Sequence, residues 1–218
     1  LQEAMVRIDA RMKQEHALGG VETGFRDFDS MTGGLHDSEL VILAARPSMG
    51  KTALALNMAE HAALSQGVGT LFVSLEMSSV ELADRLLCSI ARVNGMRLRN
   101  GSISNEDRRR LVEKAAEMSQ APLFVDDTPS RTMTEIAATA RRLKRRSNLG
   151  LVVIDYLQLI EPDNSRDPRQ EQVAKIARRL KGLARELKVP VMCLAQLNRQ
   201  AEATRDNKPR MSHLRESG

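Results

Sequence analysis

The stretch that decides the fold runs from Leu40 to Thr52 and reads LVILAARPSMGKT. Its first five residues are apolar and favour a short buried strand, while the segment from Thr52 to Leu64 has helical periodicity. Between them, ARPSMGKT follows the pattern G-x-x-x-x-G-K-[ST], with Ala45 in place of the first glycine. A strand before and a helix after are the context that this phosphate-binding loop requires, so the sequence predicts a P-loop.

Each part of this loop has a physical role in binding a nucleotide. Backbone N–H groups of the loop and of the helix N-terminus point at one place and bind phosphate oxygens. Lys51 is expected to reach the β- and γ-phosphates, Thr52 to place its hydroxyl on Mg²⁺, and Gly50 to let the backbone approach closely. Ala45 departs from the pattern and must adopt a conformation that alanine tolerates. The nucleotide-binding residues expected here are Ser48, Met49, Gly50, Lys51, Thr52 and Ala53.

Outside this stretch, apolar strand-like runs alternate with helical segments. Two of the helices open with a capping box, at Ser78 and at Thr132. The Asn94-Gly95 pair is expected to stop the first of them. Continuous Val/Ile/Leu strands between helices are typical of a mostly parallel sheet with helices on both faces, so the predicted fold class is α/β. Strands are expected at 70–74, 122–125, 151–154 and 189–194, and helices at 78–93, 104–119, 132–146 and 170–187.

Composition narrows the classes of function. The 218 residues are 42% hydrophobic and 28% charged, which suits one large domain with a real core, or a domain plus a short appendage. Two cysteines cannot form a disulfide framework, and no Cys/His spacing matches a zinc site. No apolar run approaches the roughly 18 residues of a membrane span. A net charge of +5 permits anionic partners, but four phenylalanines, one tyrosine and no tryptophan argue against a base-stacking surface. Nucleic acid would therefore be held through its phosphates.

Polar residues follow three of the expected strands. Asp155 ends the strand LVVID and is placed to hold the shell of a Mg²⁺ ion beside the phosphate loop. Glu76, in SLEMS, could orient and deprotonate an attacking water, or be a solvated residue favoured by the dipole of the next helix. Position alone leaves both roles open. Gln196 lies just past the fifth strand, where the residues alone favour a surface glutamine over a sensor of the γ-phosphate.

Five motifs in one order identify a family resemblance. They are ARPSMGKT at 45–52, SLEM at 74–77, IDYLQLI at 154–160, QLNR at 196–199 and LRESG at 214–218. Together they resemble the RecA-like motor domain of DnaB-type replicative DNA helicases, from Thr23 onward. IDYLQLI and LRESG are far more specific than the phosphate loop, which many NTPases share. The family commonly carries alanine at the position of Ala45.

The resemblance implies a function and a set of roles. It implies a hexameric DNA helicase that uses ATP and Mg²⁺ to move 5′ to 3′ on single-stranded DNA and unwind duplex during replication. Glu76 becomes the catalytic carboxylate, Gln196 the γ-phosphate sensor, and Arg85 a nucleotide-site arginine. A primase and a helicase loader are implied as partners, in the bacterial cytoplasm. The residues that match the loop holding the DNA backbone are Arg215, Glu216 and Gly218.

The resemblance also divides the chain. Residues 1–18 resemble the family's linker helix, which docks on the adjacent subunit, and Leu1, Met5, Ile8 and Met12 recur at helical spacing. Residues 19–218 then form the RecA-like ATPase domain, with a polar loop expected at 198–210. We expect a fragment, without the family's N-terminal domain and without its arginine finger. Such a fragment should bind nucleotide better than it hydrolyses it.

Three other interpretations of the same core remain. A RecA-type recombinase would form filaments and pair strands, and IDYLQLI and LRESG argue against it. A non-catalytic scaffold ring would not need intact Lys51, Thr52, Glu76 and Asp155. A small-molecule kinase shares the phosphate loop, but the sequence carries no acceptor-substrate signature.

Overall fold

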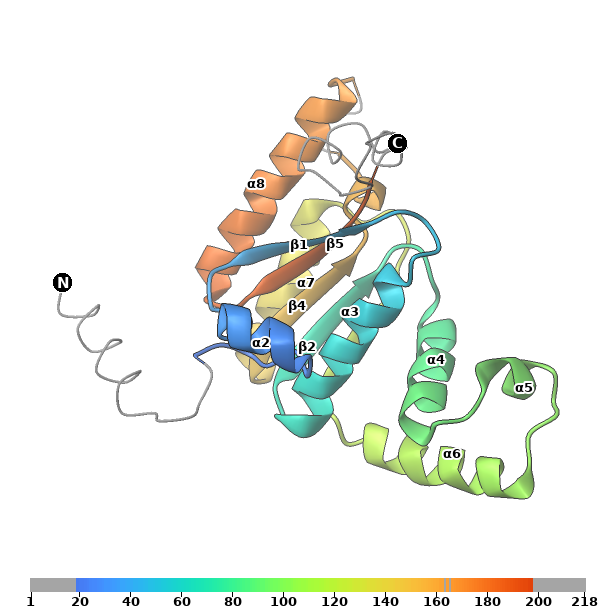
Figure 1. The fold of residues 1–218 in the computed structure, drawn as a ribbon. Coiled ribbons are helices and arrows are strands. Elements are labelled where there is room, and N and C mark those ends of the chain that lie inside the picture. Colours follow the sequence, from blue (N-terminus) through green and yellow to red (C-terminus); the bar gives the residue numbers. More distant parts are fainter. Residues whose placement is uncertain (1–18, 163, 165, 198–218) are drawn as a thin grey trace.

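Residues 19–162, 164 and 166–197 are described by the computed structural model. They form an α/β fold around a five-stranded sheet with the strand order β1-β5-β4-β2-β3 (Figure 1). All pairings in this sheet are parallel, in line with the mostly parallel sheet predicted. The strands are β1 (Leu40–Ala45), β2 (Gly69–Ser74), β3 (Leu123–Asp126), β4 (Leu149–Asp155) and β5 (Val191–Gln196).

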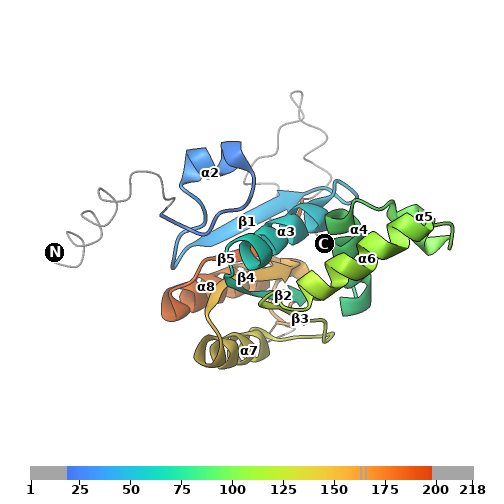
Figure 2. The same ribbon diagram turned by 90° about the horizontal axis from the view of Figure 1, so that it is seen from below.

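Helices cover both faces of the sheet. Figure 2 shows α7 and α8 on one face and α3 on the other, while α4, α5 and α6 extend to one side. None of the helices in the described part of the chain is long and apolar enough to cross a membrane. The helices are α2 (Arg26–Thr32), α3 (Lys51–Glu60) with its π-helical continuation η1 (His61–Ser65), α4 (Ser79–Ala91), α5 (Gly95–Arg99), α6 (Asn105–Met118), α7 (Met133–Arg146), the 3₁₀ turn η2 (Leu157–Leu159) and α8 (Arg169–Leu187).

The apolar character of the strands follows from burial on both faces. In β2, Leu71 packs into the core cluster formed with α7 and α8, whereas its neighbour Phe72 packs into the cluster formed with α3 and α4. Both side chains are essentially inaccessible to solvent. Successive residues of a strand point to opposite faces, so a sheet covered on both sides needs apolar residues along its whole length.

Several local details differ from the sequence prediction. Asn94 does not stop a helix; its side chain accepts hydrogen bonds from the N–H groups of Met96 and Arg97 and thereby caps α5. The preceding helix already ends at Ala91, before Arg92 in a left-handed conformation (φ 52°). α2 was not predicted. It is tied down by buried Asp29, which accepts hydrogen bonds from Thr23 and Gly24.

Strand β5 begins and ends two residues later than predicted. The N–H of Val189 donates to the carbonyl of Ala184, so Val189 closes α8, and Pro190 has no N–H to contribute to a sheet. Gln196 is therefore the last residue of β5 and pairs in register with Ala45 of β1.

The carboxyl ends of parallel strands meet at one edge of the sheet. Ala45 and Gln196 end paired strands there, and Ser74 pairs with Asp155. This edge gathers the predicted site residues, with β5 between the P-loop strand and the strand of Asp155. The predicted linker helix at 1–18, the loop at 198–210 and the predicted DNA-binding residues Arg215, Glu216 and Gly218 lie outside the described residues.

Candidate nucleotide-binding site

The phosphate loop connects the end of β1 with the start of α3. Two of its residues have left-handed backbone conformations, Ser48 at φ 64° and Gly50 at φ 81°. Ala45, at the position where the motif usually has glycine, remains in the strand. The unusual conformations therefore lie elsewhere, and alanine is tolerated. Apart from Gly50 and the backbone next to it, no atom of the described residues lies within 4 Å of the place where a Cβ on Gly50 would be, which leaves room for a ligand against the backbone.

A short polar network joins this loop to the end of β4. The hydroxyl of Thr52 donates to Asp155 Oδ2 at 2.6 Å, and Lys51 Nζ lies 3.3 Å from Asp155 Oδ1. The Asp155 side chain is 0% exposed and that of Lys51 is 12% exposed. The structure thus brings together the three residues that the sequence predicted for the phosphates and the metal, although Lys51 and Thr52 begin α3 and Asp155 ends β4.

The second carboxylate oxygen of Asp155 bears on the expected metal. Oδ1 is buried and has no hydrogen-bond partner among the described residues, because its contact with Lys51 lacks hydrogen-bond geometry. A buried anionic oxygen without a donor is costly, and a cation can satisfy it. Mg²⁺ prefers oxygen ligands and usually takes one or two from the protein, with substrate phosphates supplying others. Thr52 and Asp155 fit that donor set.

Tyr156 contributes a group that the sequence analysis missed. Lys51 Nζ lies 4.1 Å from the centre of the Tyr156 ring, an arrangement that attracts a cation to the ring face. Burial raises the pKa of the Tyr156 hydroxyl, and the negative charges of Glu76 and Asp155 add to this effect. Lys51 is thus held between a carboxylate and a ring. The motif IDYLQLI contained this tyrosine, but no spacing rule linked it to Lys51.

Glu76 lies on the short turn between β2 and α4. The hydroxyl of Ser74 donates to the carbonyl of Met77 at 2.6 Å, and the N–H of Leu75 donates to the carbonyl of Asp155 at 2.8 Å. These bonds fix the backbone on both sides of Glu76, whose own side chain is exposed. The turn therefore presents a carboxylate from a rigid base.

One cleft of about 310 Å³ collects most of the predicted residues. Its volume is near the lower end of the range for small-molecule sites. Two of the predicted residues that the structure describes do not line the cleft: Met49 is 74% exposed, and Asp155 is fully buried. Arg46 lines the cleft although the sequence analysis gave it no role. The predicted residues that line it are Ser48, Gly50, Lys51, Thr52, Ala53, Glu76, Arg85 and Gln196.

The start of α4 is held by the loop that follows β3. Ser78 caps α4 in a capping box with Glu81, and the N–H of Ser79 donates to Asp127 Oδ2 at 2.7 Å. Asp127 is the first residue of the loop that follows β3. This loop therefore helps to fix the helix that carries Arg85.

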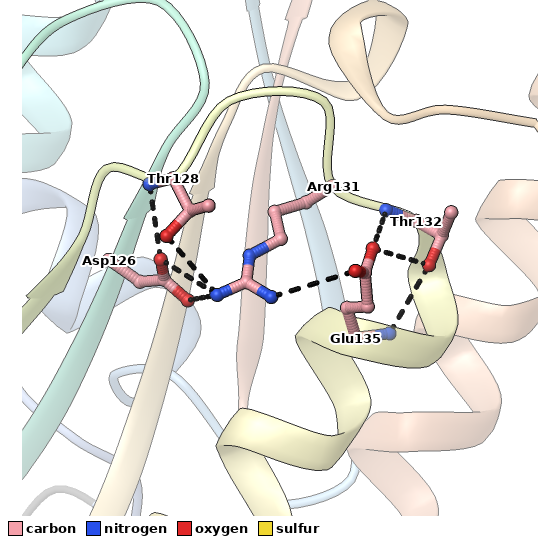
Figure 3. Close-up of polar contacts among 5 residues, drawn as sticks. All are labelled: Asp126, Thr128, Arg131, Thr132 and Glu135. Atoms are coloured by element: carbon pink, nitrogen blue, oxygen red, sulfur yellow. Dashed lines mark hydrogen bonds and ion pairs between the residues drawn. The ribbon is translucent and has the colours of Figure 1, made fainter.

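The same loop carries its own polar cluster, drawn in Figure 3. Arg131 Nη2 donates to Asp126 Oδ2 at 3.1 Å, and Arg131 Nη1 lies 3.9 Å from Glu135 Oε1. Burial acts to raise the pKa of Asp126, but hydrogen bonds from Thr128 and the charge of Arg131 outweigh it and lower the pKa. Glu135 also completes the predicted capping box with Thr132. The loop is thus locked at both ends.

A larger groove of about 920 Å³ adjoins the cleft. It lies between α3, α4 and α5 and shares Ala53, Met77 and Arg85 with the nucleotide cleft. Its lining mixes apolar groups such as Leu56 with charged ones such as Asp84. The phosphate-binding groups lie in the smaller cleft, so the larger groove suits a different ligand.

The comparisons with known proteins agree with this geometry. The family model described as "DnaB-like helicase C terminal domain" matches residues 20–218. The replicative DNA helicase DnaB of Geobacillus stearothermophilus is 45% identical over 97% of this chain and 47% of its own length. The replicative DNA helicase DnaC of Bacillus subtilis is 45% identical over 92% of this chain and 44% of its own length. The chain spans about half the length of the curated relatives it matches.

Two solved structures share the fold. One, described as an ATPase domain, has a TM-score of 0.92 and 35% identity, and the match covers 98% of this chain and 77% of that one. The other, a DnaB-like replicative helicase described with its interactions with primase, has a TM-score of 0.90 and 35% identity over 100% of this chain and 53% of that one. The chain has the RecA-like α/β fold and belongs to the DnaB-like helicase C-terminal domain family.

Proposed function

We propose that this chain is the motor domain of a hexameric replicative DNA helicase, which uses ATP to move 5′ to 3′ along single-stranded DNA and unwind duplex. The observation that carries the proposal is the convergence of Lys51, Thr52 and Glu76 on one cleft, with buried Asp155 bonded to Thr52 and paired with Lys51. Many NTPases share a phosphate loop. In a chain of this family, a carboxylate just after β2, the strand that pairs with β4, points to a hydrolytic motor.

Nucleotide binding follows from the loop and the start of α3. The N–H groups of residues 48–53 bind the phosphates, and Lys51 exchanges its contacts with Asp155 and Tyr156 for the β- and γ-phosphate oxygens. Thr52 and Asp155 hold Mg²⁺, which when bound neutralises charge on the phosphates. Arg85, from α4, supplies a further cation at the cleft.

Hydrolysis then needs a water in line with the γ-phosphate. Glu76 orients this water and accepts its proton. Gln196 contacts the γ-phosphate and changes its contacts when that phosphate leaves, which alters the exit of β5. The chain after Leu197 contains Arg215, Glu216 and Gly218, and these residues hold the DNA backbone. Arg215 pairs with a phosphate, while Glu216 and Gly218 donate backbone N–H groups. Contacts of this kind predict weak base specificity.

In a hexameric ring, the larger groove between α3, α4 and α5 can bind a segment of the neighbouring subunit. We assign to it residues 1–16 of a neighbouring copy, whose apolar stripe has helical spacing. The Met5→Glu substitution should then convert hexamers to smaller species in sedimentation experiments, while a hexamer that survives the change would contradict this assignment. A primase, a helicase loader and a place in the bacterial cytoplasm complete the proposal, in keeping with the primase interactions named for a structural relative.

The test is ATP turnover by the natural full-length protein, with and without single-stranded DNA, beside the Glu76→Gln variant. We expect single-stranded DNA to stimulate turnover several-fold. We expect the variant to lose at least about 10²-fold in turnover, the lower range for a general base, while it still binds nucleotide. Turnover that ignores DNA, or a variant as active as the wild type, would contradict the proposed function.

A further inference from the structure

The polar contacts at the exit of β5 suggest a role for a residue of IDYLQLI that the proposed function leaves unused. β5 pairs with β1 up to Gln196, but its pairing with β4 stops at Cys193. The N–H of Leu197 donates to the carbonyl of Ala45 on the β1 side. Because backbone groups alternate in direction along a strand, the N–H and C=O of Gln196 face the other side, where β4 no longer pairs.

Gln158 fills this gap with its side chain. Its Nε2 donates to the Gln196 carbonyl at 3.1 Å, and its Oε1 accepts from the Gln196 N–H at 3.3 Å. A side-chain amide offers one donor and one acceptor side by side, so it pairs with both backbone groups of one residue as a neighbouring strand would. Gln158 lies on η2, three residues after Asp155.

Both ligand-binding segments therefore hold the same short stretch of backbone. From the phosphate loop, Arg46 Nη1 donates to the carbonyl of Leu197 at 2.8 Å. From the segment after Asp155, Gln158 holds Gln196, and the Arg169 guanidinium in turn donates to the carbonyl of Gln158. The side chain of Gln196 lines the nucleotide cleft. The position of Gln196 thus depends on residues of the phosphate loop and on residues of the segment after Asp155.

We propose that Gln158 is a positioning residue for ATP hydrolysis, which holds the backbone of Gln196 so that the Gln196 side chain meets the γ-phosphate. This inference rests on the proposed function. Gln158 acts through Gln196 and does not touch the nucleotide. Its loss should therefore lower kcat and leave nucleotide affinity in place, because the phosphate loop and Asp155 remain intact.

The chain offers a matched control. Gln66 forms the same kind of clamp, since its Nε2 donates to the carbonyl of Glu22 at 2.8 Å and its Oε1 accepts from the Glu22 N–H at 3.1 Å. Gln66 does not line the nucleotide cleft. Gln158→Glu and Gln66→Glu each keep the shape and one acceptor but replace the N–H donor by a carboxylate that faces a carbonyl. Gln158→Met and Gln66→Met remove both bonds at similar volume and introduce no charge.

The experiment measures kcat, the KM for ATP and the affinity for a fluorescent ATP analogue in the natural full-length protein. We expect both Gln158 variants to lose about tenfold in kcat, in line with the sensitivity of rates to small displacements of a reacting group, with affinity within twofold of wild type. Both Gln66 variants should keep kcat and affinity within twofold. Equal losses in the two pairs, or a Gln158 variant with wild-type kcat, would overturn the inference.

A double substitution separates positioning from general damage. In a Gln196→Ala background, Gln158→Glu should lower kcat by less than twofold further, because the side chain that Gln158 positions is already gone. If Gln158→Glu lowers kcat by the same factor in the Gln196→Ala background as in the wild type, the inference is overturned. The wild-type protein and Glu76→Gln distinguish the levels of failure. If single-stranded DNA does not stimulate the wild type, the proposed function fails; if it does and Gln158→Glu is normal, only this inference fails.

Discussion

The neighbouring strands β4 and β2 both lead to a carboxylate at the same edge of the sheet, and the two carboxylates are held in opposite ways. Asp155 is fully buried, bonded to Thr52 and paired with Lys51. Glu76 projects from a turn whose backbone is fixed while its side chain is exposed. The buried group is organised before any ligand binds. The exposed group is free to take its final position with water and nucleotide, as catalytic hydrogen bonds often do.

The largest effect is expected at the β4 exit. Asp155→Asn removes the charge opposite Lys51 and one ligand of the expected metal. Turnover should fall by about 10³-fold or more, the range seen when a preorganised electrostatic group is lost. The free energy of unfolding should also fall by about 1–3 kcal/mol, less than the 3–5 kcal/mol of a fully enclosed pair, because Lys51 retains 12% exposure.

Steady-state ATP hydrolysis and urea unfolding measure these two losses. Asp37→Asn serves as a control, since Asp37 is an exposed carboxylate outside both the cleft and the network of Thr52, Lys51 and Asp155. An Asp155→Asn variant with normal turnover would contradict the role of the β4 exit.

Glu76→Gln breaks the other half of the comparison. The substitution should lower turnover by about 10²-fold or more. It should leave the free energy of unfolding within about 0.5 kcal/mol of the wild-type value, as is usual for an exposed side chain. The same two assays apply. A clear loss of stability in Glu76→Gln would show that this carboxylate is as tightly held as Asp155, and the contrast between the exits would disappear.

Tyr156 sharpens the contrast by a smaller amount. Tyr156→Leu removes the ring that lies 4.1 Å from Lys51 Nζ. A cation–π contact contributes about 0.5–1 kcal/mol at a partly exposed site. Because Lys51 gives up this contact when it binds the phosphates, the affinity for ATP should rise about two- to fivefold. Tyr156→Phe keeps the ring and should bind ATP as the wild type does. Equal binding by the leucine and phenylalanine variants, in a fluorescence titration, would show that the ring does not hold Lys51.

Asp126, at the exit of β3, provides the pH dependence of the free energy of unfolding. Because the pKa of Asp126 is lowered in the folded state, its contribution to stability is complete above the unfolded pKa and is lost as the pH falls through the folded pKa. The free energy of unfolding of the wild type should exceed that of Asp126→Asn by about 1 kcal/mol at pH 7. This difference in stability should shrink below about pH 4. Urea unfolding at several pH values measures it. A difference that grows with acidity would have the wrong sign.

Much of this site could be predicted from the sequence because local chemistry determines it. The phosphate loop, the strand ends and the capping boxes at Ser78 and Thr132 each depend on neighbours within a few residues. Parallel strands then bring Asp155 and Glu76 to one edge without further information. Both carboxylates lie at that edge in the structure.

The rest depends on pairings that no local pattern encodes. The place of β5 between β1 and β4 is set by the packing of the whole sheet. The clamp of Gln158 on Gln196 spans 38 residues and arises where two strands diverge. α2 depends on a buried carboxylate, Asp29, that collects backbone N–H groups. These features could not be predicted from the sequence and are seen only in the structure.

The most direct test of the proposed motor is strand displacement by the natural full-length protein on partly duplex DNA. One substrate carries a single-stranded 5′ tail and the other a 3′ tail, each with ATP and Mg²⁺ or with a non-hydrolysable ATP analogue. We expect the wild type to unwind only the substrate with the 5′ tail, and only with ATP, and we expect no unwinding by Glu76→Gln. Unwinding from the 3′ tail, or unwinding without hydrolysis, would contradict the proposed motor.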